Sequence, residues 1–252
     1  MMRLSECFEL PRLSLTRMPH NQLPPPRIIH EDNHLLVLDK PAGWTVQGAA
    51  PGQPSLVDWA KADLKRRYHK PGNVYLGVVS RLDQVTSGVI VLARTSKAAA
   101  RLSSQFANRE TEKTYWAILE GRVRPPSGEW RDWLIKNDQR QRMEVTSPHT
   151  PHADEAVLRY ETRRELTLPG GQAATWLEIT LLTGRKHQIR VQASQRTWPI
   201  WGDHKYGGTR AFARESIALH ARRLTLTHPT TGARLMWTAE LPVSWRMFGD
   251  IS

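Results

Sequence analysis

The sequence is poor in cysteine. It has one, Cys7, among 252 residues, so no disulfide can form within the chain and no cysteine-rich metal site is available. A chain without disulfides fits a reducing compartment, and we expect a cytoplasmic location. Cys7 lies in the N-terminal stretch, and we assign it no role.

Long apolar runs are also missing. No stretch reaches the roughly 20 apolar residues that a membrane-spanning helix needs, so we expect no membrane partner. The N-terminal stretch contains Glu6 and Glu9 and no uninterrupted apolar segment, which makes it a poor signal peptide.

The sequence lacks the common motifs for nucleotide cofactors, acyl hydrolysis and zinc. It has no Walker A sequence, no G-x-G-x-x-G after a predicted strand and no G-x-S-x-G nucleophile elbow. The ten histidines show no zinc-binding spacing. If the protein is an enzyme, we expect it to use no cofactor and no metal. Such an enzyme would rely on acid–base chemistry or on a covalent carboxylate.

Acidic residues are outnumbered by basic ones. The 36 Lys and Arg against 24 Asp and Glu give a formal net charge of +12. A basic surface attracts polyanions, because neutralising phosphates releases counterions. Nucleic acid is therefore the first candidate partner, and a solvated basic surface without a partner is the alternative. The candidate contacts are Lys61, Lys65, Arg66 and Arg67 in a predicted helix, and Arg131, Arg140 and Arg142 in a predicted loop.

Apolar periodicity and turn residues predict an α+β fold. Short apolar or alternating runs indicate strands at 35–38, 88–93, 113–121, 155–161, 174–184, 217–228 and 233–241. Helical spacing predicts helices at 54–68, 95–110 and 186–196. Several strands with few interposed helices favour a mixed, mainly antiparallel sheet core with flanking helices and loops.

Local signals support these boundaries. Ser55 with Asp58 three residues later resembles a capping box, and Thr95 or Ser96 is a suitable cap for the second helix. Residues 1–26 end in a proline run that favours an extended path. We interpret them as a tail or arm, too short to fold alone, and 27–252 as one catalytic domain. We expect a monomer.

The stretch SRLDQVTSG places a carboxylate, Asp83, close to a cation, Arg81, just before an apolar run. Taken alone, the pattern allows a turn carboxylate paired with Arg81. Thr86, Ser87 and Gly88 would then form the turn into the strand, with Gly88 allowing a close backbone approach. A glycoside hydrolase is a further alternative. It needs a second carboxylate facing Asp83, and the sequence marks none.

Five segments in series resemble the RluA-type family of RNA pseudouridine synthases. They are RLDQVTSG at 81–88, KTYWAILEG at 113–121, TGRKHQIRV at 183–191, PIWGDHKYGG at 199–208 and LHA at 219–221. The resemblance runs from about Arg27 to Pro242 and includes EDNHLLVLDKPAGWTV at 31–46. It implies a cofactor-free isomerase that converts specific uridines of ribosomal or transfer RNA to pseudouridine.

The resemblance assigns catalytic roles to three residues. It makes Asp83 the catalytic aspartate, acting as a nucleophile on the sugar or the uracil or as a general base on the sugar. It makes Arg190 the cation that keeps this carboxylate ionised in a closed pocket. Tyr115 packs on the target base and assists proton transfer. We therefore expect the Asp83 carboxylate to lie closer to Arg190 than to Arg81, with Tyr115 alongside.

Four further residues are implied to bind substrate. Arg81 enters the RNA helix when the uridine is flipped out, because chemistry on a stacked base is sterically blocked. Leu219 lines the pocket, and Thr86 and Gly88 belong to the same RLDQVTSG motif.

The sequence departs from the family at three positions. Ser80, Gln192 and Gln47 stand where relatives often have histidine. These departures keep open a second hypothesis, a catalytically inactive RNA-binding protein of the same fold. The retained Asp83, Tyr115 and Arg190 argue against it.

Overall fold

The computed structural model describes residues 23–49 and 53–251. Most of the predicted tail, 1–26, therefore lies outside the described residues. The strands are β1 (Arg27–Glu31), β2 (Leu35–Lys40), β3 (Gly77–Val78), β4 (Ser87–Ala93), β5 (Glu112–Glu120), β6 (Ser127–Asn137), β7 (Arg142–Thr146), β8 (Asp154–Leu168), β9 (Gln172–Leu181), β10 (Leu219–Thr227) and β11 (Arg234–Thr238). The α-helices are α1 (Leu56–Arg67), α2 (Ser96–Ala107) and α3 (Gln188–Gln195).

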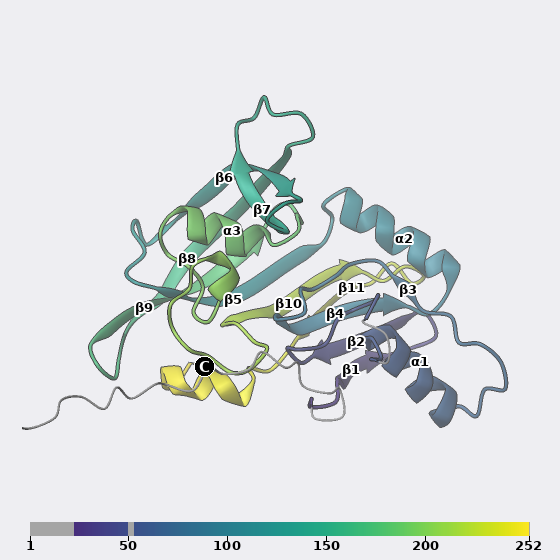
Figure 1. Cartoon of the computed structure of the whole chain (residues 1–252). Coiled ribbons are helices and arrows are strands. Elements are labelled where there is room, and N and C mark those ends of the chain that lie inside the picture. Colours follow the sequence, from purple (N-terminus) through teal and green to yellow (C-terminus); the bar gives the residue numbers. More distant parts are fainter. Residues whose placement is uncertain (1–22, 50–52, 252) are drawn as a thin grey trace, which may run out of the picture.

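These strands form one continuous sheet in the order β1-β2-β4-β10-β5-β9-β8-β6-β7, with β3 paired to β4 and β11 to β10 (Figure 1). The β4–β10 pair is parallel, and the other pairs of described strands are antiparallel. The predicted α+β class with a mixed, mainly antiparallel sheet is therefore confirmed.

Both faces of the β2–β4 half of the sheet are covered by helices. Along β4 successive side chains alternate, so that Val89 and Val91 share a core cluster with α2 residues. Ile90 and Leu92 share another with α1 residues. A strand buried on both faces has no polar side, which explains why this segment is apolar throughout.

The predicted caps of these two helices are present. The Ser55 hydroxyl accepts from the backbone N–H of Asp58, and the Asp58 carboxylate accepts from the backbone N–H of Ser55, which completes a capping box. Thr95 caps α2 by accepting from the N–H of Ala98 at 3.1 Å. These caps satisfy backbone donors that the first turn of a helix leaves unpaired.

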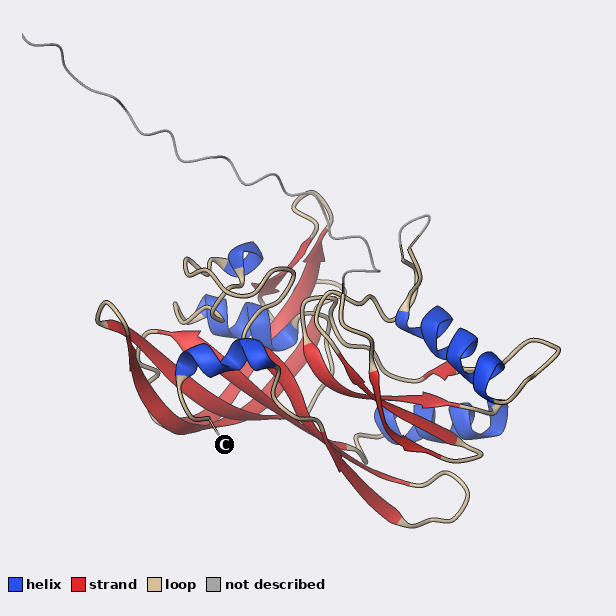
Figure 2. Ribbon diagram, turned by 90° about the horizontal axis from the view of Figure 1, so that it is seen from below, coloured by secondary structure: helices blue, strands red, loops and turns tan. Residues whose placement is uncertain are grey.

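The other half of the sheet, β5-β9-β8-β6-β7, carries α3 on one side (Figures 1 and 2). Ile189 and Ala193 of α3 pack into the largest core cluster, beneath β5, β8 and β9. A C-terminal 3-10 helix, Val243–Phe248, adds Trp245 and Phe248 to the same cluster. Figure 2 shows this helix and α3 on the half of the sheet away from α1 and α2.

The two halves meet at the β4–β10 pair. Gly88 of β4 stands opposite Ala221 of β10, and Ala221 stands opposite Tyr115 of β5. This register aligns the end of the RLDQVTSG motif with the KTYWAILEG strand, although the two are separated in sequence by the whole of α2. The middle of the sheet is therefore where the motifs converge.

The segment predicted as a middle loop is instead the β6–β7 hairpin, whose strands are labelled in the upper part of Figure 1. Arg131 and Arg142 lie in its strands, and Arg140 lies in its turn. The prediction was wrong here because charged residues break the apolar alternation of β6, where Trp130 and Leu134 are the buried side chains. In the part of the chain that the structure describes, no helix is long and apolar enough to cross a membrane.

Candidate active site

Asp83 lies in the loop between β3 and β4, and two sets of hydrogen bonds hold that loop. The N–H of Thr86 donates to the carbonyl of Asp83 at 3.1 Å, which closes a turn. The carbonyl of Gln84 accepts from the N–H of Gly43 at 2.8 Å and from the Lys40 ammonium at 3.2 Å. The Asp83 backbone is thus attached both to the start of β4 and to the loop after β2.

Lys40 is a fully buried cation that sequence reasoning did not single out. Its Nζ donates to the carbonyls of Pro41, Trp44 and Gln84, which matches its three donors with three acceptors. Burial lowers the pKa of Lys40 to about 7, although the nearby Asp83 acts in the opposite direction. Lys40 therefore fastens the loop that carries Asp83.

Arg190 connects Asp83 to a second, more deeply buried carboxylate. Its Nη1 donates to Asp83 at 3.0 Å. Its Nε and Nη2 donate to Asp203 at 2.7 and 2.8 Å, a bidentate pair. Burial lowers the pKa of Arg190, but Asp203 and Asp83 outweigh that effect and the pKa is raised. The guanidinium also lies over the Tyr206 ring, 5.0 Å from its centroid.

Arg190 lies in the first turn of α3, which starts directly after His187. His187 precedes the helix with a left-handed backbone (φ 54°), a conformation that costs a non-glycine residue free energy. Its Nδ1 lies 2.7 Å from the Tyr206 hydroxyl, and its Nε2 lies 3.7 Å from Asp83. Burial lowers the pKa of His187 to about 4, so the ring is neutral at neutral pH and does not form an ion pair with Asp83.

Tyr115 lies in β5, alongside the carboxylate. Burial raises the pKa of its phenol, and the charge of Asp83 raises it further. The hydroxyl therefore stays protonated at neutral pH and can donate a hydrogen bond. It is therefore not a phenolate at neutral pH.

A small cavity of about 60 Å³ brings most of the predicted site residues together. Among the residues that line it are Arg81, Asp83, Thr86, Tyr115, Arg190 and Leu219. Asp83 is the one acidic side chain in that described lining. The remaining predicted residue, Gly88, lines neither this cavity nor its neighbour. Its role is the close backbone approach, because a Cβ there would lie 2.3 Å from the Ala221 carbonyl oxygen.

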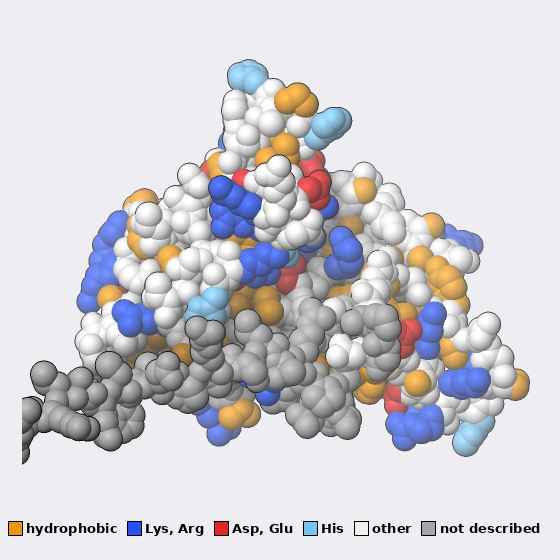
Figure 3. All heavy atoms as spheres, in the orientation of Figure 1, with side chains coloured by type: hydrophobic (Ala, Val, Ile, Leu, Met, Phe, Trp, Pro, Cys, Tyr) orange, Lys and Arg blue, Asp and Glu red, His pale blue; other side chains and the backbone are white. Residues whose placement is uncertain are grey.

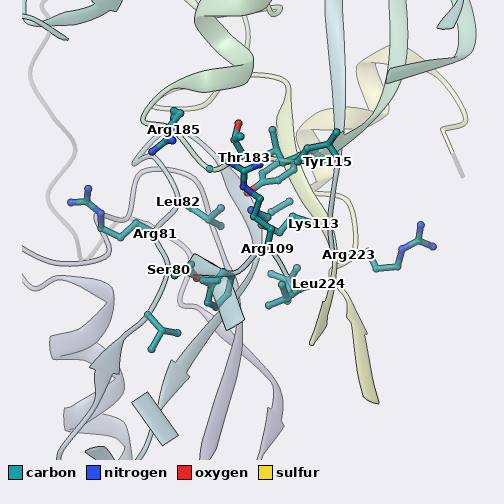
Figure 4. Close-up of a pocket in the computed structure, with 18 residues that line it drawn as sticks. Ser80, Arg81, Leu82, Arg109, Lys113, Tyr115, Thr183, Arg185, Arg223 and Leu224 are labelled. Atoms are coloured by element: carbon teal, nitrogen blue, oxygen red, sulfur yellow. The ribbon is translucent and has the colours of Figure 1, made fainter. Parts of the chain in front are cut away.

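Arg81 does not pair with Asp83, despite its place in the sequence. Within the described residues, no hydrogen bond or ion pair joins the two, whereas Arg190 lies at 3.0 Å from Asp83. Arg81 is exposed, and Figure 4 shows its side chain pointing outward from the site. This is the geometry expected of an arginine left available for another partner.

The departures from the family pattern leave the carboxylate site intact. Gln192 is fully buried, and its amide donates to Asp132 at 2.7 Å and to the carbonyls of Trp130 and Ala156. It anchors α3 to β6 and β8. Ser80 lines the neighbouring cavity rather than the small one.

Asp203, like Lys40, is a residue of the site that the sequence analysis missed. It is 1% exposed and lies in the PIWGDHKYGG segment, so a carboxylate between two glycine-containing turns was the available signal. In the described ranges no group of His, Cys, Asp and Glu could hold a metal ion.

The basic residues proposed for RNA contact are mostly paired with acids. Arg66 and Arg67 bond Asp63, and Arg131 bonds Glu129 and Glu155. Arg140 and Arg142 both bond Glu144. Figure 3 shows Lys and Arg side chains spread over one face, several of them near its centre over β7 and α3.

Comparisons with known proteins identify the family of this chain. The family model for RNA pseudouridylate synthase matches residues 34–195. The ribosomal large subunit pseudouridine synthase D of Pseudomonas aeruginosa is 37% identical over 85% of this chain and 68% of its own length. The tRNA pseudouridine synthase C of Salmonella typhi is 31% identical over 86% of each chain.

A solved structure has the same fold. Human RNA pseudouridylate synthase domain containing 4 superposes with a TM-score of 0.71 at 26% identity, covering 88% of this chain and 92% of its own. The family model covers more than half of the chain, and both relatives are more than 30% identical over most of it. This chain belongs to the RluA family of RNA pseudouridine synthases.

Proposed function

We propose that this enzyme isomerises specific uridines of ribosomal or transfer RNA, using Asp83 on a uridine flipped out of the RNA. The observation that carries the proposal is the Asp83 carboxylate, which faces the small cavity and is held by Arg190 at 3.0 Å. The relatives named for the ribosomal large subunit and for tRNA support the two RNA classes.

The reaction needs little besides a positioned carboxylate. The bond between the uracil nitrogen and the sugar breaks, the uracil turns, and a bond forms between a ring carbon and the sugar. The ring carbon then gives up its proton to a base, and the ring nitrogen released from the sugar takes one up, so that substrate and product are isomers. Asp83 can serve as nucleophile or as general base in this sequence. No atom is gained and nothing is oxidised.

The other walls of the cavity suit a detached uracil. Tyr115 and Leu219 supply apolar contact area to a ring, and such contacts hold the uracil away from solvent. The Tyr115 hydroxyl, protonated at neutral pH, can donate to a uracil oxygen or assist the proton transfer. A stacked base cannot reach this depth, so the uridine has to leave the helix, and Arg81 at the rim is suited to fill its place.

The test is to restore the gene in a strain that lacks it and to map pseudouridine across total RNA. The unsubstituted gene should restore one or more sites. The Asp83→Asn variant should restore none, because its amide is neither a nucleophile nor a base. The Asp138→Asn variant is the matched control, since Asp138 is exposed in the β6–β7 turn, and it should restore the same sites. Restoration by Asp83→Asn would overturn the proposal.

A further inference from the structure

A second cavity adjoins the small one and is larger. Its volume is about 350 Å³ against about 60 Å³, which is within the range of small-molecule sites. The two cavities share several wall residues, namely Arg81, Leu82, Tyr115, Leu181 and Arg185. Whatever enters the larger cavity therefore lies directly beside the target uridine.

The lining of this cavity is basic and contains no carboxylate. Five cationic side chains line it, and no Asp or Glu does: Arg81, Arg109, Lys113, Arg185 and Arg223. Arg185 pairs with Asp154 at 3.1 Å. No ion pair involves the other four among residues 23–49 and 53–251. Figure 4 shows Arg109 and Lys113 together near Tyr115, while Arg81 and Arg223 extend outward on opposite sides.

The charge of Arg109 makes the charged form of Lys113 less favourable. Burial lowers the pKa of the Lys113 amine, and the charge of Arg109 lowers it further. Lys113 is half-buried and Arg109 is exposed, and two neighbouring like charges are unfavourable unless an anion lies between them. A phosphate group, with several acceptor oxygens, would pair with both.

The backbone conformation of Arg109 is a second indication that this residue has a role in binding. The N–H of Arg109 donates to the carbonyl of Phe106, and the N–H of Glu110 donates to that of Gln105, at 3.3 and 2.9 Å. This is the Schellman arrangement at the end of α2, in which the residue with positive φ is usually glycine. Here that residue is Arg109, with φ 61°. The chain therefore places an arginine where glycine would be more stable.

Part of the remaining cavity wall is apolar, and Ser80 and Thr183 are among its polar residues. Val79, Leu82, Phe106 and Leu224 line it on the side of the sheet and α2. A phosphate alone would not use this surface. A cationic pair beside an apolar wall, in a cavity of this volume, matches a phosphate that carries a sugar and a base.

We propose that the larger cavity binds the nucleotide next to the target uridine, with its phosphate on Lys113 and Arg109 and its base against Phe106 and Leu82. This inference rests on the proposed function, because it takes the small cavity as the place of the target base. It makes the RNA backbone beside the target, rather than the general basic surface, the main electrostatic contact.

The first test measures RNA binding without turnover. The full chain carrying Asp83→Asn is titrated with a fluorescein-labelled uridine nonamer at several salt concentrations. A cation that contacts a phosphate contributes about 0.7 to the logarithmic salt slope for single strands. Lys113→Met should lower the slope by that amount and weaken binding roughly tenfold, as for a charge-assisted hydrogen bond.

The matched control is Lys97→Met, since Lys97 is exposed on α2 and lines neither cavity. It should change neither the slope nor the affinity. The effect of Lys113→Met should disappear when the nonamer has neutral methylphosphonate linkages. Equal behaviour of Lys113→Met and Lys97→Met, or an effect that persists on the neutral nonamer, would overturn the phosphate contact.

The second test uses Arg109→Gly. Relief of the strained backbone should raise the melting temperature by about 2 °C, while loss of the cation should weaken nonamer binding as Lys113→Met does. A merely structural arginine would not couple a gain in stability to a loss in binding. Unchanged binding in this variant would contradict the proposal.

The third test locates the base. A nonamer containing 4-thiouridine should cross-link to the peptide that includes Phe106, and cross-links confined to peptides of the small cavity would refute a nucleotide here. All three readouts are independent of pseudouridine formation. If Asp83→Asn proves active in cells, the proposed role of Asp83 fails while the binding results still stand. If the binding tests fail instead, the nucleotide site is refuted while the role of Asp83 still stands.

Discussion

Arg190 divides its guanidinium between two carboxylates in different surroundings. Asp203 is buried and bonded on two sides, whereas Asp83 receives one donor and faces the cavity. A carboxylate whose two oxygens both accept hydrogen bonds from one guanidinium is suited to hold that guanidinium. A carboxylate with one oxygen free of such a bond is suited to react. At the scale of single residues, the proposed function therefore predicts that Asp203 positions Arg190 and that Asp83 reacts.

Asp203→Asn tests this division. The amide cannot accept from both Nε and Nη2 as a carboxylate does, so Arg190 loses its bidentate anchor. We expect the single-turnover rate at saturating RNA to fall about tenfold or more, with little change in KM. Rates are compared at a temperature where circular dichroism shows the variant folded. Asp203→Glu should recover part of the rate. A rise in KM with an unchanged rate would contradict the assignment.

At the scale of elements, the decisive contact is the parallel pairing of β4 with β10. It is two residue pairs long, Ser87 with His220 and Gly88 with Ala221, and it joins the two halves of the sheet. Ser87 and His220 also bond through their side chains at 2.9 Å. The motifs RLDQVTSG, LHA and KTYWAILEG meet because this short pairing places the start of β4 beside β10, which in turn pairs with β5.

Gly88→Ala should break that junction. The new Cβ would lie 2.3 to 2.7 Å from the backbone of Ala221, at a φ of +116°. Neither backbone can move without separating β4 from β10. We expect a loss of at least about 3 kcal/mol of unfolding free energy, measured by denaturant titration.

The control for this change is Gly171→Ala. Gly171 also has a positive φ, 74°, but nothing lies within 4 Å of its Cβ position. Backbone strain alone should cost about 1 kcal/mol. If both variants lose the same free energy, the close approach at Gly88 is not what matters.

At the scale of the whole molecule, the buried His220 and the half-buried His187 predict a dependence of stability on pH. Burial lowers the pKa of both His187 and His220 to about 4, against a reference value near 6.5. Each ring binds its proton less readily in the folded chain than in the unfolded chain. Stability is therefore fully present above pH 6.5 and is lost as the pH falls toward 4.

The measurement is unfolding free energy at pH 6.5 and pH 5. Each histidine should contribute a loss of up to about 2 kcal/mol over this interval. A carboxylate such as Asp32, whose pKa is lowered to about 2 from 3.8, loses its contribution mainly below this interval. In the His220→Gln variant, the loss of unfolding free energy between pH 6.5 and pH 5 should be smaller by the contribution of one histidine. An unchanged slope in that variant would show that His220 does not titrate as described.

The parts of this structure that are predictable are those with local causes. α1 and α2 are marked by Ser55 and Thr95 as caps, and β4 is marked by an apolar run. The β6–β7 hairpin was missed because β6 has few buried side chains, and pairing with β8 rather than its own pattern stabilises it. Strand pairing between distant segments leaves no such local trace.

The sequence by itself determined the family, the motif carboxylate Asp83 and the class of chemistry, because these depend on residue types at fixed short spacings. The family resemblance also predicted Arg190 rather than Arg81 as the cation beside that carboxylate, and the contact at 3.0 Å confirms it. Only the tertiary structure brings the two together, since Arg190 lies 107 residues away in sequence and Arg81 only two. It also revealed Asp203, Lys40 and the basic cavity around Lys113. Their roles arise from burial and from contacts between strands that only the folded sheet brings together.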